Sequence, residues 1–318
     1  MASAPLPLVQ ITPRRPDAPA PAPIVRKPLW LKVQAPGGHT YGEVRRLLKD
    51  LKLNTVCEEA HCPNIGECWN HKAATFMILG DTCTRNCAYC AVAHGTPQPL
   101  DGDEPRRLAE AVAAMAMRHI VVTSVDRDDL PNGGAEQFAG VVRETRRLTP
   151  GTSIELLIPD FKGSQAALRI VVDARPDILN HNLETVSRLY RIARPGGRYE
   201  RALELLRRAK AMDGTLLTKS GVMVGLGEEW SELLTALRDV AEAGTDILTI
   251  GQYLRPSATH LPVARFYTPD EFAELRAFAL ALGFRHVESG PLVRSSYHAW
   301  DQAARAVMPR ASAWPCSR

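Results

Sequence analysis

Residues 104–125 read EPRRLAEAVAAMAMRHIVVTSV, and this stretch decides the fold class. In residues 104–118 apolar side chains recur at helical spacing, whereas residues 119–125 form an almost continuous apolar run. An amphipathic helix followed by a fully apolar strand is typical of a parallel sheet covered by helices, because such strands are buried on both faces. The stretch therefore predicts an α/β fold.

The same alternation extends through most of the chain. The other predicted strands are residues 75–80, 153–159, 177–183, 218–226, 246–254 and 284–293, and the other predicted helices are 134–148, 165–174, 184–194, 199–214, 230–244 and 268–283. Gly214, Gly244 and Gly283 stand where helix C-caps are expected. No nucleotide-binding glycine loop repeats between the units. This pattern favours a partial (β/α) TIM-type barrel of about six parallel strands over an open doubly wound sheet.

The bulk composition excludes several classes of protein. The 318 residues are 45% hydrophobic and 23% charged, as in globular domains, and a net charge of +4 is too small to indicate nucleic-acid binding. No apolar run approaches the roughly 18–20 residues of a membrane span. We divide the chain into a disordered Pro/Ala-rich arm (1–25), an N-terminal extension (26–74), a barrel (75–293) and a C-terminal extension (294–318).

The N-terminus also indicates a compartment. Residues 1–28 lack the compact apolar core of a secretory signal, and their prolines disrupt the amphipathic helix of a mitochondrial presequence. We therefore expect a cytoplasmic protein, with mitochondria as the alternative if the source is eukaryotic. In a reducing compartment, bunched cysteines favour metal or redox chemistry over disulfides.

Six of the seven cysteines lie between residues 57 and 90, in two groups of three. The second group, Cys83-x3-Cys87-x2-Cys90, follows a predicted strand at the end where barrel chemistry occurs. A structural zinc site needs four ligands, and a cubane iron–sulfur cluster held by three thiolates leaves one iron open to a small molecule. A zinc site or a plain electron-transfer cluster remains an alternative.

The first group is Cys57-x4-Cys62-x5-Cys68, which alone is compatible with a zinc site completed by His61 or His71. For His61 a solvated loop histidine is the simpler interpretation. Cys316 belongs to neither group, and we interpret it as a spare thiol.

The motifs together resemble a known family. The second triplet, with aromatic Tyr89 before its last cysteine, is similar to the cluster loop of the radical S-adenosylmethionine superfamily. The first triplet, CEEAHCPNIGECW, resembles the lipoyl synthases within it, as do TSVDRDDLPNGGA, HNLET, GQYLRPS and GPLVRSSYHA. The resemblance covers roughly residues 28–300. Ala202 stands where the family pattern has serine, which is a minor departure.

The resemblance implies a reaction and its cofactors. Lipoyl synthases insert two sulfur atoms at C6 and C8 of a protein-bound octanoyl group by radical chemistry. They use S-adenosylmethionine and two [4Fe-4S] clusters, one of which generates the radical while the auxiliary one donates sulfur. The implied partners are an octanoylated carrier domain (2-oxoacid dehydrogenase E2 or glycine cleavage H protein type), an electron donor such as ferredoxin or flavodoxin, and an iron–sulfur carrier for cluster repair. Neither nucleic acid nor a membrane is implied.

Site residues carry over onto this sequence. Cys83, Cys87 and Cys90 would hold the radical cluster, and Cys57, Cys62 and Cys68 would hold the auxiliary cluster, with Ser296 of Arg-Ser-Ser-Tyr as fourth ligand and catalytic residue. For Ser295 and Ser296 a loop or helix cap is the simpler alternative.

Further candidates stand at predicted strand ends. Those for S-adenosylmethionine are Thr123, Ser124, Asn182 and Glu184. Tyr89 of the cluster loop, which the resemblance places near the adenine, is another, and Lys219 is a candidate partner for the carboxylate. Asn182 and Glu184 also fit a helix cap and first-turn acid, and the glycines of GVMVGLGE fit either a ligand approach or a plain turn. The rival families, biotin synthases and methylthiotransferases, lack these combined motifs. A zinc-stabilised binding protein without catalysis is the rival from another class.

Overall fold

The computed structural model describes residues 26–33 and 35–302, and the predicted arm (1–25) and Cys316 lie outside this range. The main sheet has the order β1-β2-β5-β6-β7-β8-β9-β10. Its strands are β1 (Asn54–Thr55), β2 (Thr75–Ile78), β5 (His119–Ser124), β6 (Ser153–Leu157), β7 (Ile178–Asn180), β8 (Leu217–Val224), β9 (Ile247–Gln252) and β10 (His286–Gly290). All neighbours are parallel except β1 and β2. The α/β partial barrel is confirmed, with seven parallel strands in the described part of the chain rather than about six.

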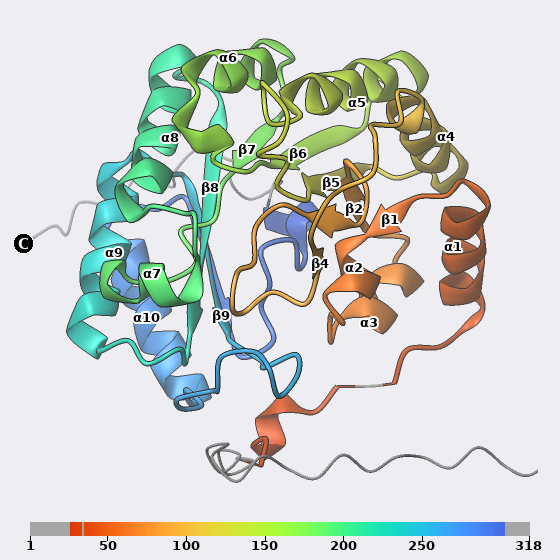
Figure 1. The fold of residues 1–318 in the computed structure, drawn as a ribbon. Helices are drawn as coiled ribbons and strands as arrows, with labels where there is room; N and C mark the ends of the chain where they lie inside the picture. Colours follow the sequence, from red (N-terminus) through yellow and green to blue (C-terminus); the bar gives the residue numbers. More distant parts are fainter. Residues whose placement is uncertain (1–25, 34, 303–318) are drawn as a thin grey trace, which may run out of the picture.

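Helices cover the outside of the curved sheet, and Figure 1 shows them as an arc from α10 round to α4. These helices are α4 (Glu104–Met115), α5 (Ala135–Leu148), α6 (Gln165–Asp173), α8 (Tyr199–Met212), α9 (Trp230–Glu242) and α10 (Pro269–Ala281). Each buries its apolar side, as α4 does with Leu108 and Val112. No helix in the described residues is long and apolar enough to cross a membrane.

The N-terminal extension closes one side of the barrel. It contains the 3₁₀ turn η1 (Leu29–Leu31), α1 (His39–Asp50), α2 (Val56–Glu59) and α3 (Ile65–Asn70). Val44, Leu48 and Trp69 are buried in the same hydrophobic cluster as β2 and β5. The ring of Trp69, which is 0% exposed, lies 5.0 Å from that of Tyr41. The extension therefore packs directly on the edge of the sheet that carries the first barrel strand.

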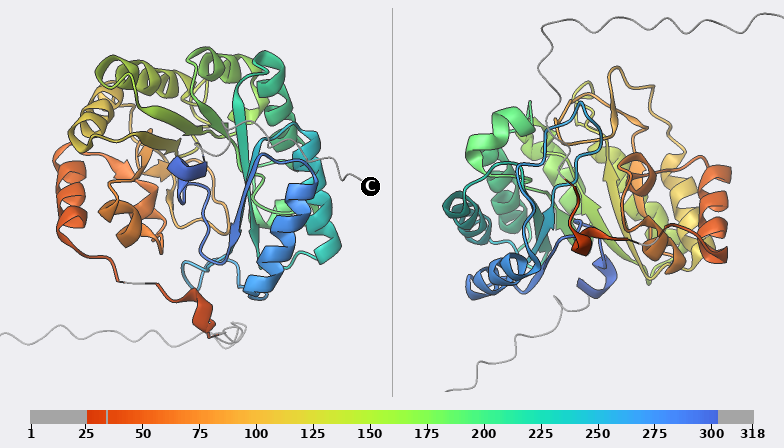
Figure 2. Two further views of the ribbon diagram at one scale, coloured as in Figure 1. Left: turned by 180° about the vertical axis from the view of Figure 1, so that it is seen from behind. Right: turned by 90° about the horizontal axis from the view of Figure 1, so that it is seen from below.

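The segment after β10 returns to the inside of the barrel. Both the front view and the view from behind place it beside β2 and the N-terminal helices (Figure 2). Gly251 permits this approach, because a Cβ at that position would lie 2.1 Å from the carbonyl oxygen of Val293. The last described residues therefore meet the cysteine-rich extension, which is more than 220 residues earlier in the sequence.

Two local predictions were wrong. The predicted helix 184–194 is broken: Glu184 has a φ of +73°, and only η3 (Ser187–Leu189) and α7 (Tyr190–Ala193) are helical. Gly214 does not have a positive φ and does not cap the preceding helix. The Asp213 side chain instead accepts the backbone N–H of Thr215 at 2.8 Å. The caps at Gly244 and Gly283 have φ of +80° and +99°, as expected for helix ends.

Candidate active site

A cavity of about 470 Å³ opens at the carboxyl ends of the barrel strands. It contains the second cysteine triplet, together with residues that follow β5, β6, β7 and β9 and Met223 near the end of β8. Tyr89, Thr123, Ser124, Asn182 and Glu184 all line it. The structure therefore brings every predicted S-adenosylmethionine contact except Lys219 into one cavity beside Cys83, Cys87 and Cys90.

The loop with the second triplet is held along its length. The short strands β3 (Thr82–Cys83) and β4 (Ala93–His94) pair at its two ends. In the middle, the backbone N–H of Ala88 donates to the Ala193 carbonyl at 2.9 Å. His260, in the loop after β9, lies 2.9 Å through Nε2 from the carbonyl oxygen of Cys90. The loop is thus fastened to both sides of the barrel mouth.

Polar atoms in the cavity are left without partners in the described residues. Ser124 Oγ, His181 Nε2 and Asn182 Oδ1 are buried and have no hydrogen-bond partner there. Buried polar groups are nearly always hydrogen-bonded in folded proteins. A bound molecule with amino, hydroxyl and carboxylate groups would satisfy them, so the lining fits a ligand such as S-adenosylmethionine. The Thr123 hydroxyl, in contrast, already donates to the Leu157 carbonyl at 2.9 Å.

Glu184 is no first-turn acid of a helix. Its left-handed backbone forms a bridge to Val222 of β8, and Asn182 Nδ2 donates to its carboxylate at 3.1 Å. Burial raises the pKa of Glu184, while Arg194 opposes the shift. Arg194 is buried and donates through Nη1 to the Asn182 carbonyl at 2.8 Å. This pair places one negative and one positive charge in the wall of the cavity.

The first triplet lies around a second, smaller cavity. Its lining includes Cys57, Cys62, Cys68 and Ser296, but not Ser295. Ser295 lines the large cavity instead, and Arg294 contacts both cavities. The two serines therefore face different sites, although they are adjacent in the sequence.

Contacts between the two extensions bring Ser296 to the cysteines. The side chain of Asn64 donates to the Leu292 carbonyl at 2.8 Å. Glu67, which precedes Cys68, accepts from the Tyr297 hydroxyl at 3.0 Å and lies 2.8 Å from His298 Nε2. These bonds stand on both sides of Ser296 and fix its position against α3.

The chemistry of both triplets fits an iron–sulfur group. Burial raises the pKa of Cys57 to about 11, and those of Cys68 and Cys87 to about 12. Such thiols ionise only when a cation compensates the charge, and metal binding supplies it. No three His, Cys, Asp or Glu side chains among residues 26–33 and 35–302 converge on a position for a single metal ion.

Two candidate ligand contacts make bonds within the protein instead. Lys219 Nζ lies 2.9 Å from Glu155 Oε1 inside the barrel, and both side chains are 0% exposed. Its ammonium is thus used within the core, below the large cavity. The glycine turn after β8 is also structural, because the Glu228 carboxylate accepts the backbone N–H of Gly225 at 2.6 Å.

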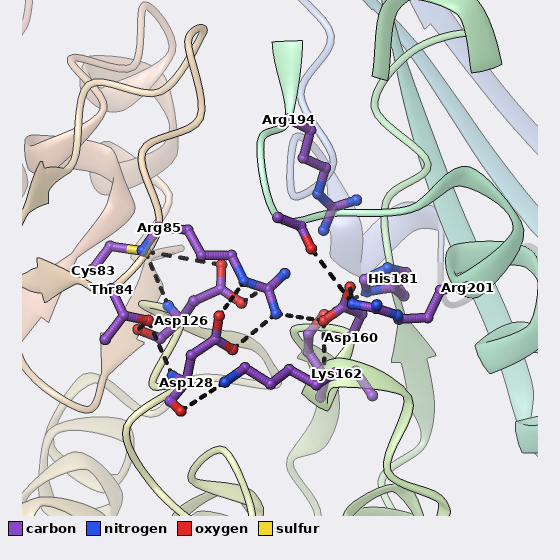
Figure 3. Close-up of polar contacts among 12 residues, drawn as sticks. Cys83, Thr84, Arg85, Asp126, Asp128, Asp160, Lys162, His181, Arg194 and Arg201 are labelled. Atoms are coloured by element: carbon purple, nitrogen blue, oxygen red, sulfur yellow. Dashed lines mark hydrogen bonds and ion pairs between the residues drawn. The ribbon is translucent and has the colours of Figure 1, made fainter. Parts of the chain in front are cut away.

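Sequence reasoning missed the charged residues around the loop. Arg85 lies among Asp126, Asp128 and Asp160, and Arg201 pairs with the outer oxygen of Asp160 at 3.0 Å (Figure 3). Although burial raises the pKa of Asp160, its pairing with Arg85 holds that pKa well below its usual range. Asp126 and Asp128, two of the three carboxylates in SVDRDD directly after β5, were the only available signal for these contacts.

Fold and site together define a radical S-adenosylmethionine enzyme, and comparisons with known proteins agree. The model of the radical SAM superfamily matches residues 77–240, and that of the N-terminal domain of lipoyl synthase matches residues 21–62. Among solved structures, methylornithine synthase is 16% identical with a TM-score of 0.50, covering 78% of this chain and 82% of that one. The [FeFe]-hydrogenase maturase HydG is 14% identical with a TM-score of 0.52, and the match covers 73% of this chain and 62% of that one. These two likenesses concern the fold.

Curated relatives narrow the class further. A lipoyl synthase of Rubrobacter xylanophilus is 58% identical over 87% of this chain and 86% of its own length. A lipoyl synthase of Koribacter versatilis is 56% identical over 95% of this chain and 97% of its own length. The chain therefore belongs to the lipoyl synthase family, whose activity is radical-mediated sulfur insertion into a protein-bound octanoyl group. The chemistry of the superfamily uses a [4Fe-4S] cluster and S-adenosylmethionine.

Proposed function

We propose specific roles for this chain's residues in adding two sulfur atoms, at C6 and C8, to an octanoyl group on a carrier protein. Cys83, Cys87 and Cys90 would hold the [4Fe-4S] cluster that binds S-adenosylmethionine. With that cluster in place, S-adenosylmethionine supplies a primary carbon radical able to take hydrogen from an unactivated carbon. Tyr89, Ser124, Asn182 and Glu184 then bind and orient the rest of S-adenosylmethionine. Thr123, the remaining predicted contact, only lines the wall of the cavity.

The sulfur-donating co-substrate is an auxiliary [4Fe-4S] cluster on Cys57, Cys62, Cys68 and Ser296. One observation carries this assignment: Ser296 shares the small cavity with the three cysteines, whereas Ser295 faces the large cavity. A hard oxygen ligand on an iron that otherwise has soft sulfur ligands is more easily displaced. That lability suits a cluster that loses sulfur during turnover.

The octanoyl chain enters the large cavity, whose lining includes apolar side chains. These are Met77, Val125, Leu157, Met223 and Leu254. Because Arg294 borders both cavities, a substrate radical formed in the large one lies next to the sulfur store in the small one.

The acylated substrate is a carrier domain of the 2-oxoacid dehydrogenase E2 or glycine cleavage H protein type. It docks at the cavity mouth, where Lys27 lines the rim. Next to it Leu29 and Trp30 are 76% and 42% exposed, which suits a protein partner. A ferredoxin or flavodoxin type of reductant and an iron–sulfur carrier complete the proposed cycle. The cytoplasm remains the proposed compartment, because the cysteines are assigned to clusters rather than disulfides.

The test is anaerobic turnover of an octanoyl-lysine peptide with S-adenosylmethionine and a strong reductant, followed by mass spectrometry. The reconstituted protein should contain about eight irons and eight sulfides, and the peptide should gain two sulfurs. Ser296→Ala should lose sulfur insertion while still cleaving S-adenosylmethionine, and Ser231→Ala, at an exposed position of the outer helix α9, is the control that retains both. Normal single-turnover sulfur insertion by Ser296→Ala would remove the ligand role from this serine.

A further inference from the structure

Arg85 lies between the first two cysteines of the second triplet, and its side chain is nearly inaccessible, at 4% exposure. Its guanidinium binds Asp128 with two parallel bonds, Nε to Oδ2 at 2.8 Å and Nη2 to Oδ1 at 2.9 Å. Nη2 also donates to Asp160 at 2.6 Å, and Nη1 lies 3.5 Å from Asp126. One arginine of the loop is therefore held by the ends of two neighbouring barrel strands, as Figure 3 shows.

The backbone around Arg85 is fixed by the same carboxylate-bearing segment. Thr84 donates its N–H to the Asp126 carbonyl at 3.0 Å, and the Thr84 hydroxyl accepts the N–H of Asp128 at 3.0 Å. As a result two backbone N–H groups converge on Cys83 Sγ. They belong to Asp126, at 3.3 Å, and to Arg85 itself, at 3.4 Å.

Backbone N–H groups aimed at a cluster thiolate stabilise the reduced, more negative state of an iron–sulfur cluster and so raise its reduction potential. A bidentate guanidinium–carboxylate pair constrains both position and angle, and a single ammonium does not reproduce it. The contacts of Arg85 with Asp126, Asp128 and Asp160 form a clamp. This clamp is therefore suited to hold the Cys83 segment in the geometry that directs both N–H groups at Cys83 Sγ.

We propose that Arg85 is a positioning residue: its clamp by Asp126, Asp128 and Asp160 keeps two backbone N–H groups on Cys83 and thereby sets the reduction potential of the radical cluster. The inference rests on the assignment of Cys83, Cys87 and Cys90 to that cluster. Arg85 also lines the large cavity, but in this role it acts through the backbone of the loop rather than by contact with a ligand. Arg201 supports the clamp from outside, because it occupies the second oxygen of Asp160.

The variant Arg85→Lys keeps the positive charge but loses the bidentate geometry of the guanidinium, so it tests the effect of geometry alone. Hydrogen–deuterium exchange of cluster-free protein should show the amides of residues 83–87 exchanging about tenfold faster, because a charge-assisted bond of the clamp is lost. In the reconstituted protein, the midpoint potential of the paramagnetic signal that responds to added S-adenosylmethionine should shift to more negative values. Asp128→Asn should also accelerate the hydrogen–deuterium exchange of the amides of residues 83–87. This variant, for which only exchange is measured, provides the test if Arg85→Lys does not fold.

Arg146→Lys is the matched control. Arg146 pairs with Asp177 at 2.6 Å near the opposite ends of the strands, so its variant should change neither readout. Unchanged exchange in Arg85→Lys, or faster exchange with an unchanged potential, would overturn the proposal. Neither readout depends on sulfur insertion. A Cys83→Ala protein that keeps the S-adenosylmethionine-responsive signal would instead contradict the cluster assignment itself.

Discussion

Replacing Lys219 by methionine tests whether this residue belongs to the barrel core or to the cofactor site. Lys219 Nζ lies 2.9 Å from Glu155 Oε1, and Asn180 Nδ2 donates to the same carboxylate at 2.8 Å. Burial lowers the pKa of Lys219, while the charge of Glu155 opposes the shift. The methionine variant leaves Glu155 buried without its cation.

Loss of one partner of a buried ion pair costs about 3–5 kcal/mol, because the remaining charge is uncompensated. For a chain of this size each kcal/mol lowers Tm by about 2 °C, so Lys219→Met should lower the Tm of the cluster-free protein by about 6–10 °C. The double variant Glu155→Gln/Lys219→Met removes both charges and should recover more than half of that loss.

The assay is thermal unfolding of the cluster-free wild type, the two single variants and the double variant, followed by S-adenosylmethionine affinity of the reconstituted proteins. The affinity should be unchanged within about twofold in Lys219→Met, because its ammonium lies in the core. A variant with the wild-type Tm but much weaker S-adenosylmethionine binding would refute the structural role and restore Lys219 as a ligand.

Three further predictions address the cavity, its mouth and the buried imidazoles. Glu184→Gln should weaken S-adenosylmethionine binding by about 10–100-fold, as expected for loss of one charged contact, and calorimetry that shows unaltered affinity would exclude the contact. A Leu29→Ser/Trp30→Ser variant should raise KM for an intact octanoylated carrier domain but not for an octanoyl-lysine peptide; equal effects on both substrates would argue against docking there. Burial lowers the pKa of His119 and of His181 to about 4, so the unfolded chain binds more protons below pH 6.5 and stability should fall between about pH 6.5 and 4. Urea unfolding of cluster-free His181→Gln should show a shallower decline, and a decline equal to that of the wild type would contradict a neutral buried His181.

The sequence was sufficient for the fold class because the alternation of amphipathic helices and apolar strands reports burial directly. It located seven strands and most of the helices, and the spacing of Cys83, Cys87 and Cys90 after β2 placed the site at the correct end of the barrel. It was wrong for residues 184–194, because a helical pattern there is overridden by tertiary contacts: Glu184 bridges to β8, and Arg194 is buried against Asn182.

The resemblance implied Ser296 as the ligand, but only the tertiary structure shows that Ser295 and Ser296 line different cavities. The two serines are alike in local sequence, whereas long-range bonds from Asn64 and Glu67 orient this segment and place one serine at each cavity. Local sequence likewise does not show the partner of a buried charged residue. A lysine at a strand position is compatible with a ligand or with a core residue. For Lys219 the ion pair with Glu155, two strands away in the sheet order β6-β7-β8, favours the core. Sequence determines which residue types and periodicities are available, but the partner of each polar group depends on which strands the barrel brings together.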